Sequence, residues 1–466
     1  MGFARFEFFR TGTYFPSFHR AFFSLIFVFI SMGGCSKVGE KEEKTVWVES
    51  WSKARPMNEK RVGAASGVFG EFIFVAGGAS ENDHEGLLDT VEFTRVRKDG
   101  SLAPWKYTKK LVQPRVFAVG IVHNSTLYVI GGESGLKDED LLSSIERTRV
   151  LPDGSLETWE VDSSLMSTPR RSPVPFIIGN RLYVSGGYNG KFLTDVESAE
   201  IRADGSFGPW RNESADTRYD RYIHAGVVYN SVAFLFGGHS TKPGGAYDEV
   251  EWSAVNPEDG FLNLWRKAPK MRTKRYLNGA ALHNSTVYLI GGRNTVLLTG
   301  VEKARFASST SFKPDSFTWE SDTPLSTPRE GLTVSVVGDY IFAVGGRSFK
   351  GILSSVEMAE VKPGGRLGHW GTRRENDELK RSPIPEDAIS HFTLGNEFAK
   401  FDHLDSALRE MEEGIRLSPD TPEAYFFVGK IYLKKRAPLQ AKEAFLRAVN
   451  LKPNYPEALF SLAVSY

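Results

Sequence analysis

The side chains best suited to chemistry in this chain are arginines, tyrosines and histidines at positions that vary between otherwise regular repeats. Arginine grips carboxylates in a bidentate fashion, and both arginine and tyrosine are enriched where proteins recognise one another. A histidine such as His224 titrates in the range of a general base, although a single histidine near a strand start is more often structural. The candidate ligand-binding residues are Arg171, Tyr188, Tyr222, His224, His239, Tyr276, Arg293, Glu330 and Arg347.

A Gly-Gly doublet that recurs six times at one phase in the 466 residues sets the phase of these positions. The steps between successive doublets are 54, 55, 51, 54 and 54 residues, so one structural unit is copied six times. The doublets are Gly77-Gly78, Gly131-Gly132, Gly186-Gly187, Gly237-Gly238, Gly291-Gly292 and Gly345-Gly346.

Three further landmarks keep step with the doublets: an arginine sixteen residues earlier, a hydrophobic residue followed by glutamate, and a tryptophan. A residue that recurs in every repeat is expected to have a structural role in the repeat, because a ligand on the axis does not have six-fold symmetry. We therefore expect these arginines and glutamates to tie strands or neighbouring repeats together, and the tryptophans to pack between sheets. The landmarks are Arg61, Arg115, Arg170, Arg221, Arg275 and Arg329; Glu92, Glu146, Glu197, Glu251, Glu302 and Glu357; Trp105, Trp159, Trp210, Trp265, Trp319 and Trp370; and Trp51 one period earlier.

Between these landmarks the pattern is strand and turn. A short run rich in β-branched and aromatic residues precedes each doublet, as in residues 127–130. Asp-Gly-Ser turns, for example Asp99-Gly100-Ser101, separate the glutamate run from the tryptophan and are a strong hairpin signal. Each unit is thus predicted to be four antiparallel strands.

The paired glycines, the hydrophobic-glutamate pair and the tryptophan, in that order, resemble the kelch repeat. The resemblance implies an all-β six-bladed propeller over residues 47–371. The chain has seven of these tryptophans but six phased doublets, so one strand is left outside the six complete repeats. Residues 45–51 are therefore either an extra outer strand or the strand that closes the ring.

The variable positions come directly after the doublets and directly after the arginines. Alternating strand directions place both sets of loops on one face of the propeller. Repeats three to six carry the basic and aromatic candidates, whereas repeats one and two carry the acidic loops at 83–85 and 138–140. We expect a face with a basic-aromatic side and an acidic side, suited to a protein partner or an acidic sugar. The alternative is ordinary loop polarity.

The N-terminus predicts export. Basic residues precede a ten-residue apolar run at 21–30, which is too short to span a membrane but typical of a signal peptide. Small residues then lead into Cys35, the only cysteine in the chain. This resembles a bacterial lipoprotein signal, with 1–34 removed, Cys35 lipidated, delivery to the outer membrane and 35–46 as a charged tether. An incidental buried thiol behind a plain secretory signal is the alternative.

The C-terminal part predicts helices. After a linker at 372–387, two copies of a pattern repeat at a 34-residue period over 388–466, as in Leu394-Gly395 and Val428-Gly429, with a partial third copy. The spacings resemble the tetratricopeptide repeat, a small all-α solenoid. The resemblance implies a groove for a peptide or helix. Its inner positions would be Phe392, Asn396, Phe426, Lys430 and Phe460.

Composition excludes several classes. The net charge of +1 gives no basic field for nucleic acid, and no zinc spacing or phosphate loop occurs, so we expect no metal and no cofactor. With no catalytic constellation evident, the sequence favours a non-enzymatic, lipid-anchored envelope scaffold with protein or peptide partners. The alternative is a glycan-binding or sialic-acid-processing propeller, because kelch-type six-bladed propellers include bacterial sialic-acid epimerases.

Overall fold

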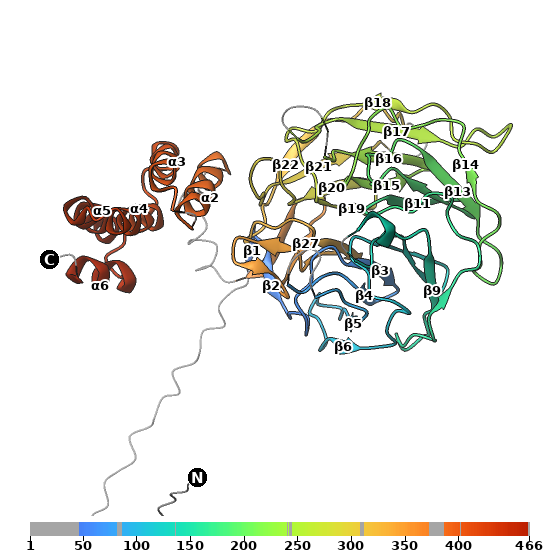
Figure 1. The fold of residues 1–466 in the computed structure, drawn as a ribbon, viewed down its shortest axis with the longest axis horizontal. Helices are drawn as coiled ribbons and strands as arrows, with labels where there is room; N and C mark the ends of the chain where they lie inside the picture. Colours follow the sequence, from blue (N-terminus) through green and yellow to red (C-terminus); the bar gives the residue numbers. More distant parts are fainter. Residues whose placement is uncertain are drawn as a thin grey trace, which may run out of the picture. The chain divides into compact units, whose positions relative to one another are not determined.

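The computed structural model describes residues 46–81, 86–135, 137–239, 241, 245–307, 312–371, 386–400 and 402–464. The described residues up to 371 form six sheets around one axis, and five α-helices follow (Figure 1). The predicted signal peptide, Cys35, nearly all of the predicted tether, the acidic loop at 83–85 and linker residues 372–385 lie outside the described residues.

Five sheets have four antiparallel strands each, numbered from the axis outward. In blade 1 they are β3 (Ala65–Phe69), β4 (Phe72–Ala76), β5 (Val91–Arg95) and β6 (Lys106–Tyr107); in blade 2, β7 (Val119–His123), β8 (Thr126–Ile130), β9 (Ile145–Arg149) and β10 (Glu160–Val161); in blade 3, β11 (Val174–Ile178), β12 (Arg181–Ser185), β13 (Val196–Glu200) and β14 (Arg211–Asn212); in blade 4, β15 (Ala225–Tyr229), β16 (Val232–Phe236), β17 (Val250–Ala254) and β18 (Arg266–Ala268); in blade 5, β19 (Gly279–His283), β20 (Thr286–Ile290), β21 (Val301–Arg305) and β22 (Trp319–Asp322).

Blade 6 draws on both ends of the propeller. It contains β23 (Thr333–Val337), β24 (Tyr340–Val344), β27 (Val356–Val361) and β28 (Leu367–Gly371), together with β1 (Val46–Val48) and β2 (Ser52–Ala54). Two short elements lie in loops: the hairpin of β25 (Arg347–Ser348) with β26 (Gly351–Ile352), and the 3₁₀ helix η1 (Asp138–Asp140). The six-bladed propeller predicted from the repeat is confirmed.

The hydrophobic core lies between neighbouring blades. Phe74 of blade 1 shares one cluster with Leu127 and Val129 of blade 2, while Ile73 of blade 1 shares another with Phe342 of blade 6. The second strand of each blade is therefore apolar on both faces, since both faces are covered by neighbours. Strand β4, for example, is buried at every position.

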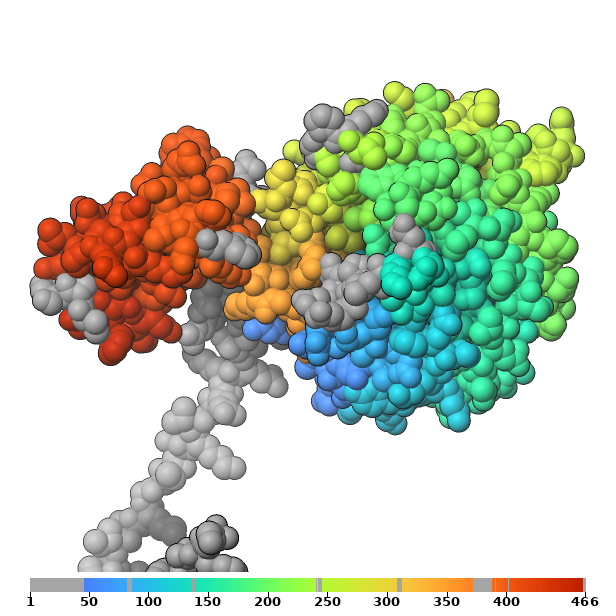
Figure 2. Space-filling view, viewed as in Figure 1, coloured from blue at the N-terminus to red at the C-terminus, as the bar shows by residue number. Residues whose placement is uncertain are grey.

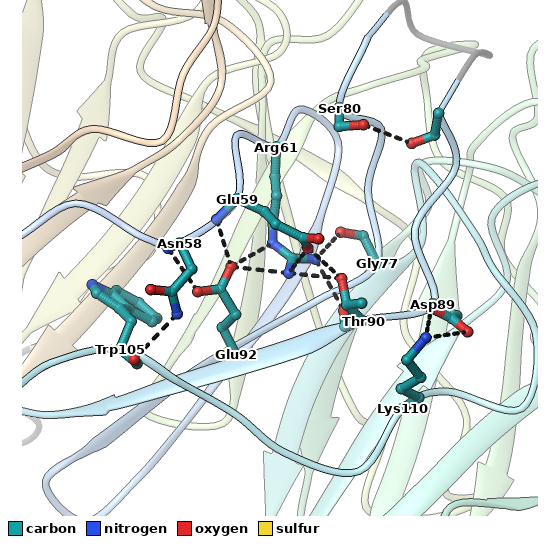
Figure 3. Close-up of polar contacts among 11 residues, drawn as sticks. Asn58, Glu59, Arg61, Gly77, Ser80, Asp89, Thr90, Glu92, Trp105 and Lys110 are labelled. Carbon is teal, nitrogen blue, oxygen red and sulfur yellow. Dashed lines mark hydrogen bonds and ion pairs between the residues drawn. The ribbon is translucent and has the colours of Figure 1, made fainter. Parts of the chain in front are cut away.

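The arginines and glutamates that recur in every repeat form buried ion pairs with a structural role, as expected. Each arginine pairs with the glutamate of its own blade at 2.6–3.1 Å, and neither partner is more than 3% exposed. In blade 1, Arg61 Nη1 also donates to the Gly77 carbonyl at 2.8 Å, and Glu92 accepts the backbone N–H groups of Asn58 and Glu59 (Figure 3). One ion pair thus joins the loop before the first strand and the loop after the second strand to the third strand of the blade.

The glycine doublets join each blade to the next. The second glycine donates its N–H to the carbonyl of the next blade's arginine, at 2.9 Å from Gly78 to Arg115, and Gly346 closes the cycle on Arg61 at 2.8 Å. The first glycine has positive φ, and a Cβ on Gly77 would lie 2.5 Å from the Arg115 carbonyl oxygen. A side chain would therefore clash with the neighbouring blade, which explains the glycine.

Strand β2 closes the ring. It pairs with β27, so that Ser52 lies opposite Met358, in the place that β6 takes beside β5 in blade 1. Trp51, 3% exposed, donates its indole N–H to the Thr323 carbonyl at 2.9 Å. Figure 2 shows this N-terminal segment in blue against the orange surface of blade 6. Strand β1 pairs with β28 as an additional outer strand, so the outer-strand alternative holds within residues 45–51, whereas the closing strand β2 begins one residue after that segment.

Trp370 does not have the role that the repeat pattern assigned to it. It lies on β28, is 57% exposed and contacts Trp47 edge-on at 5.6 Å between ring centroids. The packing position of the sixth tryptophan belongs to Trp51, which comes from the other end of the propeller.

A hydrogen-bonded ring of backbone groups encircles the axis. The residue two after each arginine has positive φ, and these six residues form five N–H to carbonyl bonds of 2.7–3.1 Å between adjacent blades. In the described chain, the corresponding bond between the Ile223 N–H and the Ser172 carbonyl is not formed. The ring residues are Gly63, Phe117, Ser172, Ile223, Leu277 and Gly331.

The C-terminal helices are α2 (Glu386–Lys400), α3 (Leu404–Leu417), α4 (Pro422–Lys434), α5 (Pro438–Leu451) and α6 (Pro456–Val464). Glycines allow close packing within successive pairs, because a Cβ on Gly414 would lie 2.4 Å from Phe392 and one on Gly429 would lie 2.4 Å from Phe445. In the described part of the chain no helix is long and apolar enough to cross a membrane.

Candidate functional site

The variable rim positions meet in pairs within each blade. The residue after the arginine forms an isolated antiparallel bridge with the residue after the doublet, so both lie on the same face of the propeller. The six pairs are Val62 with Ala79, Val116 with Glu133, Arg171 with Tyr188, Tyr222 with His239, Tyr276 with Arg293, and Glu330 with Arg347. We call these residues, together with Phe192, the rim.

Aromatic side chains form a continuous band over blades 3 to 5. Tyr188 and Tyr222 lie 5.5 Å apart between ring centroids, and Phe192 contacts both. Phe192 meets His239 edge-on at 5.5 Å, and His239 meets Tyr276 at 4.9 Å. All five rings are partly exposed, so the band offers flat apolar faces with polar edges to solvent.

A charged group lies at each end of this band. At one end, the Arg171 guanidinium lies over Tyr188 at 4.8 Å and pairs with Glu133 at 2.7 Å. At the other end, Arg293 and Arg347 both pair with Glu330, at 3.2 and 2.7 Å. Both arginines are 34% exposed at their side chains, whereas Glu330 is 2% exposed.

The predicted acidic side stays a prediction, because loop 83–85 lies outside the described residues, while loop 138–140 forms η1 with Glu139 71% exposed. Glu133 and Glu330 are buried counter-ions of the arginines, so Glu330 does not face a ligand as expected. Around blades 1 and 2 the rim is otherwise apolar, because Val62, Ala79 and Val116 form a cluster there. The rim holds three arginines and two carboxylates, which is a formal charge of +1. Burial lowers the pKa of His239, and the charge of Arg293 lowers it further.

Phe192 was missed by the sequence prediction. It bridges to Tyr188 from the loop that follows the doublet. A signal existed, because a residue at this phase lies four positions before each hydrophobic-glutamate pair and only blade 3 has an aromatic there. The residues at this phase are Leu87, Leu141, Phe192, Ala246, Leu297 and Ile352.

His224 lies inside the propeller, not on the rim where it was expected. It is 7% exposed, and its Cε1 lies 2.9 Å from the position that a Cβ on Gly186 of blade 3 would take. Neither ring nitrogen has a hydrogen-bond partner in the described structure. Burial lowers its pKa well below the ordinary value of 6.5, and the charge of Arg221 lowers it further.

This burial predicts acid sensitivity. The folded protein binds fewer protons at His224 than the unfolded chain, so the stabilisation is complete above pH 6.5 and is lost as the pH falls. Between pH 7 and pH 5, we expect the free energy of unfolding of the wild type to fall by about 2 kcal/mol more than that of His224→Ala. Urea unfolding at both pH values measures the difference. An equal pH dependence in the two proteins would contradict a buried neutral imidazole.

In the helical part, two of the five predicted groove residues share a cavity. Asn396 of α2 and Lys430 of α4 line a volume of about 210 Å³ together with apolar side chains including Met411 and Phe427. The Lys430 ammonium lies 5.7 Å from the ring centres of both Phe426 and Phe427. This is a cationic group on an apolar floor, the chemistry for a carboxylate beside a hydrophobic side chain.

The other three predicted residues do not line this cavity. Phe392 packs on Gly414 of α3, and Phe426 packs on Phe445 and Tyr455. Phe460 is 72% exposed on α6. Among the residues that the structure describes, no cluster of histidine, cysteine, aspartate or glutamate could hold a metal ion.

The ring of six antiparallel sheets and its repeat landmarks define a kelch-type propeller. Curated relatives agree: the chain is 26% identical over 214 residues to kelch repeat protein M-T8 of myxoma virus, covering 45% of this chain and 38% of that protein. It is 24% identical over 257 residues to mouse kelch-like protein 15, covering 53% and 41%, and 27% identical over 214 residues to bovine kelch domain-containing protein 3, covering 41% and 54%.

The chain thus spans about half the length, or less, of the curated relatives it matches. A solved structure titled "Structure of YjhT" has the same fold, with a TM-score of 0.54 and 15% identity over 67% of this chain and 98% of that one. No family profile matches the chain.

Proposed function

We propose that this chain is a non-enzymatic, lipid-anchored protein of the bacterial cell envelope that holds protein partners through its propeller rim and its helical groove. The rim carries the proposal. Its partly exposed aromatic rings and half-buried arginines are the residue types enriched at the centres of protein interfaces. Kelch-type propellers commonly bind protein partners, which supports the same reading.

The helices would supply a second binding module. Their 34-residue pattern resembles tetratricopeptide repeats, and the Asn396–Lys430 cavity suits the carboxylate of an extended or helical peptide. Lipid-modified Cys35 would anchor the protein in the outer membrane. Residues 35–46 would form the tether between the anchor and the propeller. Acyl chains on Cys35 would keep both binding modules near the membrane.

An acidic glycan is the second candidate ligand of the rim. One observation favours it: Arg293 and Arg347 both lie against Glu330 with side chains that are 34% exposed, and arginine binds a carboxylate in a bidentate fashion. Tyr276, beside Arg293, would offer an aromatic face to a sugar ring.

Crosslinked pull-down from native envelopes with the full chain separates these functions. The rim variant is Arg293→Gln, Glu330→Gln and Arg347→Gln together, so that no charge is left buried without a partner. The groove variant is Asn396→Ala with Lys430→Ala. Arg95→Ala with Arg366→Ala is the control, because these exposed arginines lie outside the rim.

We expect the rim variant to lose at least ten-fold of one specific partner while the control retains it, and the groove variant to lose a different partner. Calorimetry with N-acetylneuraminic acid tests the alternative. Sugar binding that only the rim variant loses, with an unchanged partner list, would replace the scaffold by a glycan-binding function. An unchanged list and no sugar binding would contradict both roles of the rim.

A further inference from the structure

A cavity of about 110 Å³ lies on the propeller axis, where all six blades contribute to its wall. It is bounded by the axial backbone ring and by the residue that follows each ring position. The residues of this second layer are Ala64, Ala118, Pro173, His224, Asn278 and Leu332. Four of the six are apolar, and the two polar ones come from adjacent blades, 4 and 5.

Both polar residues have unmet hydrogen-bonding capacity. His224 is 7% and Asn278 is 8% exposed. Neither nitrogen of His224 nor the Oδ1 of Asn278 has a partner in the described structure. Buried polar atoms without partners carry the desolvation cost of hydrogen bonds that are not made, so a molecule that supplies these bonds gains that free energy on binding.

The backbone adds two more groups on the same side of the axis. The ring is broken between Ser172 and Ile223, which both line the cavity and directly precede Pro173 and His224. Ile223 holds a positive φ of 50°, a conformation that a β-branched residue rarely adopts. The Ser172 carbonyl and the Ile223 N–H therefore do not bond to each other, and both residues belong to the wall of the cavity.

We propose that this axial cavity binds a small neutral hydroxyl compound, such as a short diol or polyol, with its hydroxyls on His224 and Asn278 and its carbons against the apolar wall. A hydroxyl both donates and accepts, so it satisfies the Asn278 oxygen and either imidazole nitrogen. The volume corresponds to about three to four water molecules, which suits about four to six non-hydrogen atoms. A charged ligand is disfavoured because Arg221, whose charge acts on the His224 imidazole, is already paired with Glu251.

No rim residue lines this cavity. Saturation-transfer NMR on the full chain tests the proposal with 1,2-propanediol and glycerol as probes and acetate as a charged probe of similar size. One variant combines His224→Ala with Asn278→Leu. A second, Ala64→Leu, fills the cavity but keeps both polar groups. Each new residue already occurs at this phase, since Ala118 and Leu332 occupy it in blades 2 and 6. We therefore expect both variants to fold.

We expect transfer to the two hydroxyl probes in the wild type, at least a five-fold reduction in each variant, and no transfer to acetate. If the double variant does not fold, the proposal is tested by Ala64→Leu alone, which should reduce saturation transfer to the hydroxyl probes. Absence of transfer in the wild type would mean that the cavity holds only water, and undiminished transfer in Ala64→Leu would place the probes elsewhere. Equal transfer to acetate would rule out recognition of a neutral ligand. Each of these three results overturns the proposal.

Discussion

Replacing Glu146 by alanine is expected to lower the free energy of unfolding by about 3–5 kcal/mol, because it leaves the Arg115 guanidinium buried without a counter-ion. Both side chains of this pair are 0% exposed and meet at 2.6 Å. Glu146 also accepts the backbone N–H groups of Val112 and Gln113, so the variant loses those bonds as well. Urea unfolding followed by tryptophan fluorescence measures the change.

Two other variants should lower the free energy of unfolding by smaller amounts. Glu92→Ala removes the corresponding carboxylate of blade 1, but Arg61 keeps a second partner in Glu59 at 2.7 Å, so we expect a smaller loss (Figure 3). Glu71→Ala breaks an exposed pair with Arg95 and should cost less than about 1 kcal/mol. A Glu146 variant as stable as the Glu71 variant would show that the buried pairs do not hold the blades together.

Replacing Trp51 by alanine is expected to cost about 3–5 kcal/mol, since it empties a buried site at the closure of the ring. Trp51 is 3% exposed, belongs to the core between blades 5 and 6, and bonds to the Thr323 carbonyl. The neighbouring strand β2 gives blade 6 the outer pairing that β6 gives blade 1. Loss of this packing should therefore open the ring at one seam, which limited proteolysis of the N-terminal segment would detect.

Trp370→Ala is the matched control. It removes the same side chain from the same blade, but from a site that is 57% exposed, so we expect a loss of less than about 1 kcal/mol. If Trp370→Ala destabilised the propeller as much as Trp51→Ala, the outer strand β28 would be the closure instead of β2.

The repeat by itself determined the number of blades, the order of strands within each blade and the structural use of the invariant arginines, glutamates and glycines. These features depend on contacts between positions at a constant spacing, such as Arg61 with Gly77, so the same pattern in every copy reports them. The positions of the rim residues also follow from this phase, because strands that alternate in direction return each loop to the same face.

Only the tertiary structure decided which tryptophan closes the ring, since Trp51 and Thr323 lie 272 residues apart and either end of the propeller could have supplied the strand. It also decided that Glu330 is a buried counter-ion and that His224 faces the interior. Sequence phase places a residue within its own blade, whereas burial and pairing depend on side chains that the neighbouring blade supplies. The partners of Glu330, Phe192 and His224 come partly from adjacent blades, which is why the period alone could not assign them.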